Sequence, residues 1–390
     1  MKSMDVFSLD KEYIANTYGR LNVAFKSGKG SVLTDFDGKE YIDLGSGIAV
    51  TSFGIADDEW VNAVIAQLNS VQHVSNYYYT EPQAMLAQAL CEKTGMIKVY
   101  FGNSGAEANE CAIKVARKYG NSVMGLEAPV IITLKNSFHG RTVTPLTATG
   151  QDVFHKDFGP FTPGFVYAEA NNKDELEKLV AQNPCCAVMM ELIQGEGGVM
   201  ALDADYVAFV RELCDKNNML LLIDEVQTGN GRTGELFAFM NYGVQPDVFT
   251  TAKGLGGGLP IGACIIGEKA KDVLKAGDHG STFGGNPVCA AGALNIIERL
   301  DAELLESVKS KGEYIVSQLK DAHGVEAISG MGLMLGIKTQ KDAKAILKEC
   351  LERGVLVLTA KDKVRLVPAL NIPMDELEKA IAVLKEIIAG

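Results

Sequence analysis

The stretch DVFTTAKGLGGGLPIG, residues 247–262, predicts a short apolar strand that ends at a single lysine, Lys253. Five glycines follow within the next nine residues, so the backbone after this lysine can turn sharply and approach other groups closely. Lysine is rarely buried unless it is paired or has a chemical role. The common alternative is a surface lysine whose amine extends into solvent. The glycine-rich loop favours a chemical role for Lys253.

Short apolar runs of the same kind recur along the chain and alternate with amphipathic segments. Strands that are apolar on both faces lie between layers of helices in mostly parallel sheets. The predicted fold class is therefore α/β, with a large domain built on a mostly parallel sheet covered by helices. The other runs are IKVYF (97–101), PVIITL (129–134), CAVMMEL (186–192), MLLLIDE (219–225) and GACIIG (262–267), and the clearest helical segments are 106–120 and 203–217.

The two ends of the chain differ from its middle. SVLTDFDGKEYIDLG, residues 31–45, alternates about an Asp37-Gly38 turn and predicts a hairpin. We predict an N-terminal segment at 1–45 that packs with a small domain, a large domain at 46–290, and a C-terminal α+β small domain at 291–390. After Pro287 the chain becomes helical and then gives the strand-like runs VEAISG, LMLGI, VLVLT and KVRLVPAL before a closing helix.

Composition and charge exclude several classes of protein. The 390 residues carry a net charge of -12 and have a pI of about 5.0, so the phosphate backbone of a nucleic acid would be repelled. No apolar run approaches the roughly 20 residues that cross a bilayer, so no membrane partner is expected. The eight cysteines include no C-x-x-C pair, so no metal site is predicted. The N-terminal segment has no apolar signal region, and we predict a cytoplasmic location.

Candidate binding groups follow the strands, where ligands bind in open α/β sheets. GNSGAEANE, residues 102–110, opens a helix after a strand and suits an anion such as phosphate, although Ser104 is also a plain helix cap. NSFHGRT, residues 136–142, offers Phe138 to a flat ring and Arg141 to a carboxylate. Core packing for Phe138 and a surface ion pair for Arg141 are the alternatives.

A third strand, in LLLIDEVQTG (220–229), ends at Asp224-Glu225. This is also the pattern of a Walker B motif, but no G-x-x-x-x-G-K-[ST] stands elsewhere in the chain, so an ATPase is not supported. The carboxylate instead suits a protonated ring nitrogen. GNGRTG (229–234) matches G-x-G-x-x-G, but it lacks the strand and the later acidic residue of a dinucleotide site. An anion cradle, a carboxylate for a ring nitrogen and a Schiff-base lysine together describe pyridoxal 5′-phosphate (PLP).

With these motifs in order, the chain resembles the class III, fold-type I PLP-dependent aminotransferases over nearly its whole length, and within them the acetylornithine aminotransferases. The resemblance implies a fold-type I PLP-transferase, whose large domain has a seven-stranded type of sheet, and which works as a homodimer with shared active sites. The motifs that carry it are NTYGRLNVAF, DGKEYIDLGSGIAV, HVSNYYYTEP, FGNSGAEANECAIKVAR, SFHGRT, QGEGG, DEVQTGNGRTG, AKGLGGGLPIG and STFGGNP.

The resemblance implies a role in cofactor binding for ten residues. Asp224 and Lys253 are the two catalytic residues among them. The phosphate is held by Ser104, Gly105 and Ala106; the ring lies between Phe138 and Val226; Asp224 pairs with its nitrogen; Gln227 reaches its phenolic oxygen; Glu225 is a further contact; Lys253 forms the Schiff base; and Thr282 reaches the phosphate of the partner subunit.

The resemblance also implies how two substrates share one site. Arg141 and Arg365 bind the two carboxylates of glutamate, and Glu196 neutralises Arg365 when the ω-amino donor is bound. Tyr18 joins Arg141 at the far carboxylate of that donor, and Ser281 approaches the substrate. The implied reaction moves the ω-amino group of N2-acetyl-L-ornithine to 2-oxoglutarate, giving N-acetyl-L-glutamate 5-semialdehyde and L-glutamate, a step of arginine biosynthesis.

Other functions remain open at this point. Succinylornithine, ornithine and 4-aminobutyrate are alternative donors within the class, because they differ in the part of the molecule that residue spacing does not reveal. A non-catalytic regulatory protein that has kept the PLP fold is an alternative from a different class. Asp224, Lys253 and Arg365 are all present, which favours the enzyme.

Overall fold

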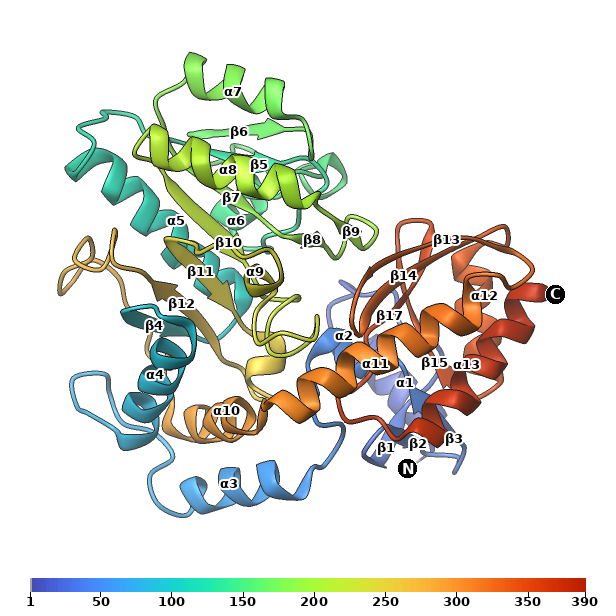
Figure 1. Ribbon diagram of the computed structural model, residues 1–390. Coiled ribbons are helices and arrows are strands. Elements are labelled where there is room, and N and C mark those ends of the chain that lie inside the picture. Colours follow the sequence, from blue (N-terminus) through green and yellow to red (C-terminus); the bar gives the residue numbers. More distant parts are fainter. Residues whose placement is uncertain (1) are drawn as a thin grey trace.

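The computed structural model describes residues 2–390 and is organised around a seven-stranded sheet (Figure 1). The strand order is β4-β12-β11-β10-β7-β5-β6, and β12 alone is antiparallel to its neighbours. This sheet confirms the predicted fold class, and of its strands only the edge strand β6 was not predicted from the sequence. The strands are β4 (Lys98–Gly102), β5 (Val130–Leu134), β6 (Phe165–Ala168), β7 (Cys185–Met190), β10 (Leu220–Asp224), β11 (Val248–Thr251) and β12 (Gly262–Ile266).

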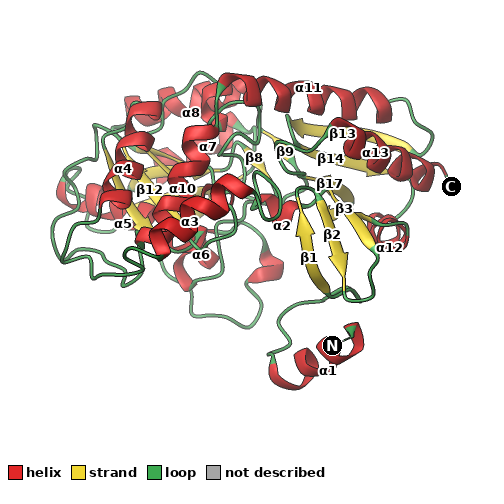
Figure 2. Cartoon of the chain, turned by 90° about the horizontal axis from the view of Figure 1, so that it is seen from below, coloured by secondary structure: helices red, strands yellow, loops and turns green. Residues whose placement is uncertain are grey.

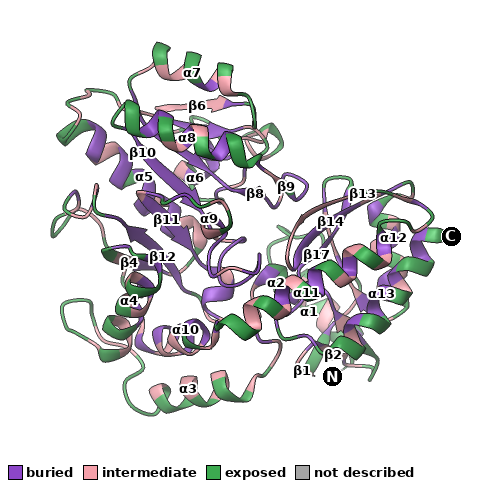
Figure 3. Ribbon diagram, viewed as in Figure 1, coloured by how far each residue is buried: buried purple, intermediate pink, exposed green. Residues whose placement is uncertain are grey.

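The central strands are buried on both faces, as their unbroken apolar sequences predict (Figure 3). Successive residues of β10 point to opposite faces, so Leu221 and Ile223 belong to one core and Leu220 and Leu222 to the other. Helix α5 packs across the sheet at the second core. The helices around the sheet are α3 (Asp58–Leu68), α4 (Glu81–Thr94), α5 (Gly105–Ser122), α6 (Val143–Ala148), α7 (Lys173–Gln182), α8 (Ala204–Lys216), α9 (Ala238–Asn241) and α10 (Pro287–Arg299).

Strands from the two ends of the chain form one sheet, in the order β1-β2-β3-β15. The predicted hairpin is present as the antiparallel pair of β2 (Val32–Asp35) and β3 (Glu40–Asp43), which follow β1 (Phe25–Lys29). The run VLVLT is two strands, not one: β15 (Val355–Leu356) pairs with β3, and β16 (Leu358–Ala360) pairs with β17. The division of the chain near residues 45 and 290 stays a prediction.

A second small sheet has the order β13-β14-β17-β16, and helices cover it (Figure 1). Helix α1 lies apart from the rest of the molecule in Figure 2. Within residues 2–390, no helix combines the length and apolar character needed to cross a bilayer. The remaining elements are α1 (Ser3–Tyr13), α2 (Ser46–Ala49), β8 (Ile193–Gln194), β9 (Met200–Ala201), α11 (Ala302–Leu319), β13 (Val325–Met331), β14 (Met334–Thr339), α12 (Ala343–Glu352), β17 (Lys363–Leu366) and α13 (Met374–Ala389).

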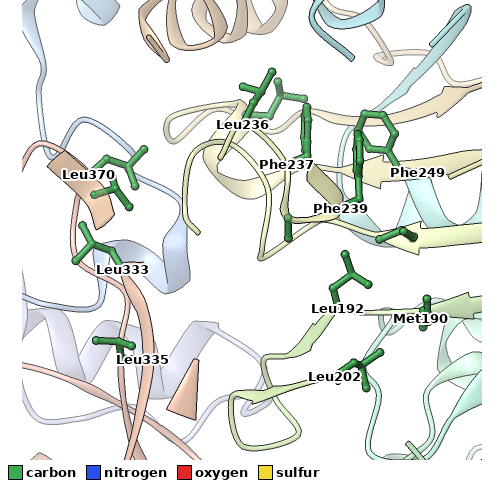
Figure 4. Close-up of a cluster of buried hydrophobic side chains, with 14 of the residues drawn as sticks. Met190, Leu192, Leu202, Leu236, Phe237, Phe239, Phe249, Leu333, Leu335 and Leu370 are labelled. Atoms are coloured by element: carbon green, nitrogen blue, oxygen red, sulfur yellow. The ribbon is translucent and has the colours of Figure 1, made fainter. Parts of the chain in front are cut away.

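The GNGRTG segment joins the large sheet to the C-terminal part of the chain. Arg232 is buried, and its Nη1 donates hydrogen bonds to the carbonyl oxygens of Leu333 and Pro368. A β-carbon at Gly231 would lie 3.0 Å from side-chain atoms of Leu300 and Leu370, so a glycine suits this contact. The motif therefore has a structural role here. Figure 4 shows the apolar cluster around this junction, which includes Leu236, Phe237, Phe239, Leu333 and Leu370.

Candidate active site

A cavity of about 480 Å³ opens at the carboxyl ends of the sheet strands. It is lined by residues that follow β4, β5, β7, β10 and β11 and by the loop that precedes β12. These ends meet because parallel strands align their carboxyl ends at one edge of a sheet. Nine residues predicted from the sequence line it: Ser104, Gly105, Ala106, Phe138, Arg141, Asp224, Val226, Gln227 and Lys253.

Asp224 is the last residue of β10, and its buried carboxylate is held from three sides. Its Oδ2 accepts hydrogen bonds from Asn109 Nδ2 at 2.7 Å and from His139 Nδ1 at 2.8 Å. Its Oδ1 accepts one from the Val226 N–H at 3.0 Å. These contacts hold the Asp224 side chain in place at the base of the cavity, because a buried polar group is stable only when it is hydrogen-bonded.

Asn109 and His139 were not predicted from the sequence to be site residues. Both stand inside quoted motifs, but their contacts with Asp224 span 115 and 85 positions of the chain. Asn109 also donates to the His139 carbonyl oxygen at 2.7 Å and accepts from the Thr250 hydroxyl at 2.7 Å. A network of this kind depends on strand order, which residue spacing alone does not predict.

Lys253 lies at the end of β11 in a strained backbone conformation, with φ of +45°. A residue with a side chain in the left-handed region costs about 1–3 kcal/mol and persists only when its surroundings hold it. Asn230 Nδ2 donates to the Ala252 carbonyl oxygen at 3.2 Å, and the Ser52 hydroxyl donates to the Gly254 carbonyl oxygen at 3.0 Å. Burial lowers the pKa of the Lys253 amine, while Glu196 acts in the opposite direction. The neutral, nucleophilic amine is favoured as a result.

The N-terminus of α5 forms the wall of the cavity that suits an anion. The Ser104 side chain caps this helix by accepting from the Glu107 N–H at 3.2 Å. The first N–H groups of a helix have no partner within the helix, so they are available to an anionic ligand. A β-carbon at Gly105 would lie 2.7 Å from Val226 Cγ1, so only glycine fits between the helix and Val226.

Arg365 reaches the site from β17, in the C-terminal part of the chain. It is buried, and its Nη1 lies 2.6 Å from Glu196 Oε1 and 3.1 Å from Gln227 Oε1. Glu196 lies in the loop between β8 and β9, and Gln227 lines the cavity. The structure thus brings together the arginine and the glutamate that the sequence analysis paired, beside a predicted cofactor residue.

Glu225 is not placed in the cavity, contrary to the expectation that it contacts the cofactor. Its Oε1 accepts from the Phe239 N–H at 2.8 Å, and its Oε2 accepts from the Thr228 hydroxyl. Glu225 directly follows Asp224 at the end of a strand, and successive strand residues point to opposite faces. The Glu225 side chain is therefore buried on the far side of this strand from the Asp224 side chain.

Three other predicted residues lie away from this chain's own cavity. Tyr18 is exposed, and the guanidinium of Arg20 lies 5.3 Å from the centre of its ring. Ser281 and Thr282 line a second, neighbouring hollow of about 970 Å³. The Ser281 hydroxyl accepts from Asn103 Nδ2 at 3.0 Å, and Asn103 borders the first cavity. One chain alone does not bring Tyr18 or Thr282 to the cofactor cavity.

We expect Glu225→Gln to flatten the pH dependence of folding stability. Burial raises the pKa of Glu225 from 4.5 to about 7. Between pH 4.5 and pH 7, the carboxyl therefore binds its proton more tightly in the folded state than in the unfolded state. In the wild type, this carboxyl therefore lowers the free energy of unfolding by roughly 3 kcal/mol as pH rises through that window. Glutamine keeps both hydrogen bonds, because the Thr228 hydroxyl can also accept. Urea unfolding at pH 5 and pH 8 measures the free energy of unfolding of both proteins. The value for the variant, relative to that of the wild type, should be higher at pH 8 than at pH 5; an equal difference at both pH values would contradict this account.

The residues that line the cavity fit PLP. The volume matches a small cofactor, the helix N-terminus suits a phosphate, and Lys253 offers an amine to an aldehyde. A carboxylate has about four lone-pair sites. The chain itself uses three of those on Asp224, which leaves one for a protonated ring nitrogen. Phe138 and Val226 line the same space and offer apolar faces to a flat ring.

Comparison with known proteins agrees with this chemistry. The chain is 47% identical over 391 residues to the acetylornithine aminotransferase of Haemophilus ducreyi, with all of both chains covered. The crystal structure of an ornithine aminotransferase from Toxoplasma gondii superimposes with a TM-score of 0.95 at 30% identity, covering 100% of this chain and 95% of that one. The N-acetylornithine aminotransferase of Stenotrophomonas maltophilia gives 0.82 at 36% identity, with 98% of both chains covered. The model of the aminotransferase class-III family matches residues 13–388, and the chain belongs to this family of PLP-dependent aminotransferases.

Proposed function

We propose that this enzyme moves the ω-amino group of N2-acetyl-L-ornithine to 2-oxoglutarate, giving N-acetyl-L-glutamate 5-semialdehyde and L-glutamate in arginine biosynthesis. The observation that carries the proposal is the full-length similarity to curated relatives of that name, which are 40% to 47% identical to this chain. The solved ornithine aminotransferases are more distant, at about 30% identity. The geometry of the cavity supports the general chemistry, as follows.

When bound, PLP supplies an electron sink for the negative charge left on the substrate's amine-bearing carbon after that carbon loses its proton. Asp224 keeps the ring nitrogen protonated, because its carboxylate is fixed and shielded from water. Lys253 takes up the proton from the substrate carbon and holds it at Nζ until it is returned. Burial suits this role, since it lowers the pKa of the Lys253 amine and so favours the neutral form, which can accept a proton.

The two arginines account for the two substrates. Arg141 lines the cavity, so its guanidinium can meet a carboxylate near the cofactor. The same guanidinium lies 4.3 Å from the centre of the Phe154 ring, which helps to position it. Arg365 is neutralised by Glu196 in this structure. That pairing suits an ω-amino donor, which places no carboxylate there. Glutamate would have to displace Glu196 from Arg365 to bind its α-carboxylate by a two-pronged contact.

A homodimer with shared sites belongs to the same proposal. Thr282 and Ser281 lie at the neighbouring hollow, outside the cavity of their own chain, where a partner's phosphate and substrate would meet them. Tyr18 is exposed and would complete the binding site for the donor's far carboxylate. A cytoplasmic location remains part of the proposal.

A panel of half-reactions tests the substrate. The enzyme loaded with PLP is mixed with acetylornithine, succinylornithine, ornithine or 4-aminobutyrate, and the loss of the cofactor's visible absorbance is followed by stopped flow. We expect acetylornithine to react at least about 10-fold faster than ornithine, because a site that hydrogen-bonds the acetamide would leave its own polar groups unpaired when ornithine binds. Faster reaction with another donor would reassign the substrate. Loss of absorbance with none of the four, and none with glutamate, would favour a non-catalytic protein.

A further inference from the structure

Glu191 is a buried carboxylate at the carboxyl end of β7 that borders the active-site cavity. Both of its oxygens accept backbone hydrogen bonds, and the two donors come from different loops. Oε1 accepts from the Phe138 N–H at 2.8 Å, and Oε2 accepts from the Gly195 N–H at 3.2 Å. One side chain therefore holds two loops that are 57 positions apart in the sequence (195 − 138) at fixed separation.

Each loop carries a residue that faces the site. The first carries Phe138 itself, which lines the cavity. The second carries Glu196, which follows Gly195. The Glu196 Oε1 atom lies 2.6 Å from Arg365 Nη1. The second loop also packs tightly on the site, because a β-carbon at Gly195 would lie 2.3 Å from Gln227 Nε2. Displacing Gly195 would therefore move Glu196 and disturb Gln227.

The surroundings of Glu191 make an ionised carboxylate costly there. His139, Asp224 and Lys253 are the titratable groups that act on it or feel its charge. Burial raises the pKa of Glu191 to about 7, while the charge of His139 acts in the opposite direction. Stability alone does not favour a carboxylate at such a position, since unpaired buried charge is destabilising. Acceptance of one N–H group at each end of the side chain is, however, a task that glutamine cannot perform, because one end of its amide is an NH₂ group that only donates.

We propose that Glu191 is a positioning residue that sets the donor specificity of the enzyme by holding the Glu196 loop and the Phe138 loop in register. The inference rests on the proposed function, since it assigns Glu196 the task of neutralising Arg365 for the ω-amino donor. With Glu191 in place, Glu196 stays on Arg365 until glutamate displaces it. Without Glu191, the 195–198 loop loses an anchor, and Arg365 is less fully neutralised.

The test compares Glu191→Gln with Glu196→Ala and the wild type. In Glu191→Gln the amide nitrogen must face one of the two N–H groups, so the side chain no longer holds the two loops at a fixed separation and both can shift. We expect KM for the ω-amino donor to rise by about 10-fold while KM for glutamate changes by less than about 2-fold, the same direction as in Glu196→Ala. Visible circular dichroism of the bound cofactor should also weaken, because Phe138 no longer fixes the ring plane. Glu191→Asp keeps the carboxylate, but its shorter side chain reaches only one loop. It should therefore give the same changes in KM and dichroism as Glu191→Gln, and it replaces that variant in the test if Glu191→Gln does not fold.

Asp247→Asn is the matched control. Asp247 is also a largely buried carboxylate that accepts a backbone N–H, from Leu221 at 2.7 Å, but it precedes β11 and lies at the opposite edge of the sheet. The Asp247→Asn variant should be less stable than the wild type, but it should keep the wild-type ratio of KM for the ω-amino donor to KM for glutamate and the wild-type dichroism. A ratio that moves as much in Asp247→Asn, or equal rises of both KM values in Glu191→Gln, would overturn the proposal.

The test of Glu191 can fail or succeed independently of the proposal that acetylornithine is the donor. The donor used is the one that reacts fastest in the half-reaction panel, and glutamate is common to all candidates. An error in the donor therefore changes the compound but leaves the expected ratio intact. If no donor reacts, the dichroism and the cofactor's dissociation constant still report whether Glu191 positions Phe138: unchanged values in both variants would overturn the proposal.

Discussion

Lys253→Ala is expected to lower kcat/KM for transamination by about 10⁴-fold, the upper end of what a positioned acid–base group contributes. The variant loses both the amine that anchors the aldehyde of PLP and the group that carries the proton from the substrate carbon. No other lysine among the cavity-lining residues can take its place. Stopped-flow half-reactions measure the rate, and the visible spectrum of the protein with PLP should shift to that of the free aldehyde.

Lys311→Ala is the control for this change. Lys311 is also a buried lysine whose pKa is lowered by burial, but its amine donates to the Leu370 carbonyl oxygen at 3.0 Å, away from the cavity. It should lose stability and keep the cofactor's spectrum. An unchanged spectrum in Lys253→Ala itself would remove the assignment of Lys253 as the anchoring residue.

Asp224→Asn should lower kcat by about 10²–10³-fold, the usual cost of removing one fixed electrostatic group from a catalytic site. The amide has nearly the same shape, but it carries no charge to hold a proton on the ring nitrogen. Its single oxygen also cannot serve both His139 and Asn109 together with the Val226 N–H at their present places. The affinity for PLP should fall far less than the rate, because the helix N-terminus and Lys253 still bind the cofactor.

Single-turnover rates and a cofactor titration by fluorescence separate the two effects. Asp247→Asn provides the same chemical change at the other edge of the sheet and should leave the rate close to that of the wild type. If the loss of PLP affinity in Asp224→Asn were as large as the loss of rate, Asp224 would be a binding residue and not one that acts on the ring's charge.

Much of this architecture follows from local patterns of residues. Runs such as 219–225 are apolar on both faces, so they predict central strands, and β10 is indeed buried throughout. Asp224 and Lys253 stand at the ends of two such runs, and β10 and β11 are parallel neighbours, so the two groups meet at one edge. The edge strand β6 was missed, because FVYA is short and only partly buried. The run 355–359 was misjudged, because its middle residue passes from one sheet to another.

The side-chain network of the site could not be predicted from such local patterns. Asn109, His139 and Glu191 lie within or beside quoted motifs, yet their contacts join segments whose proximity depends on strand order. The direction of Glu225 was likewise decided by the geometry of the strand end. Residue types and their alternation report burial and secondary structure, because these depend on near neighbours along the chain. Contacts such as Glu196 with Arg365, 169 positions apart, arise only once long-range packing has placed the strands and loops in register.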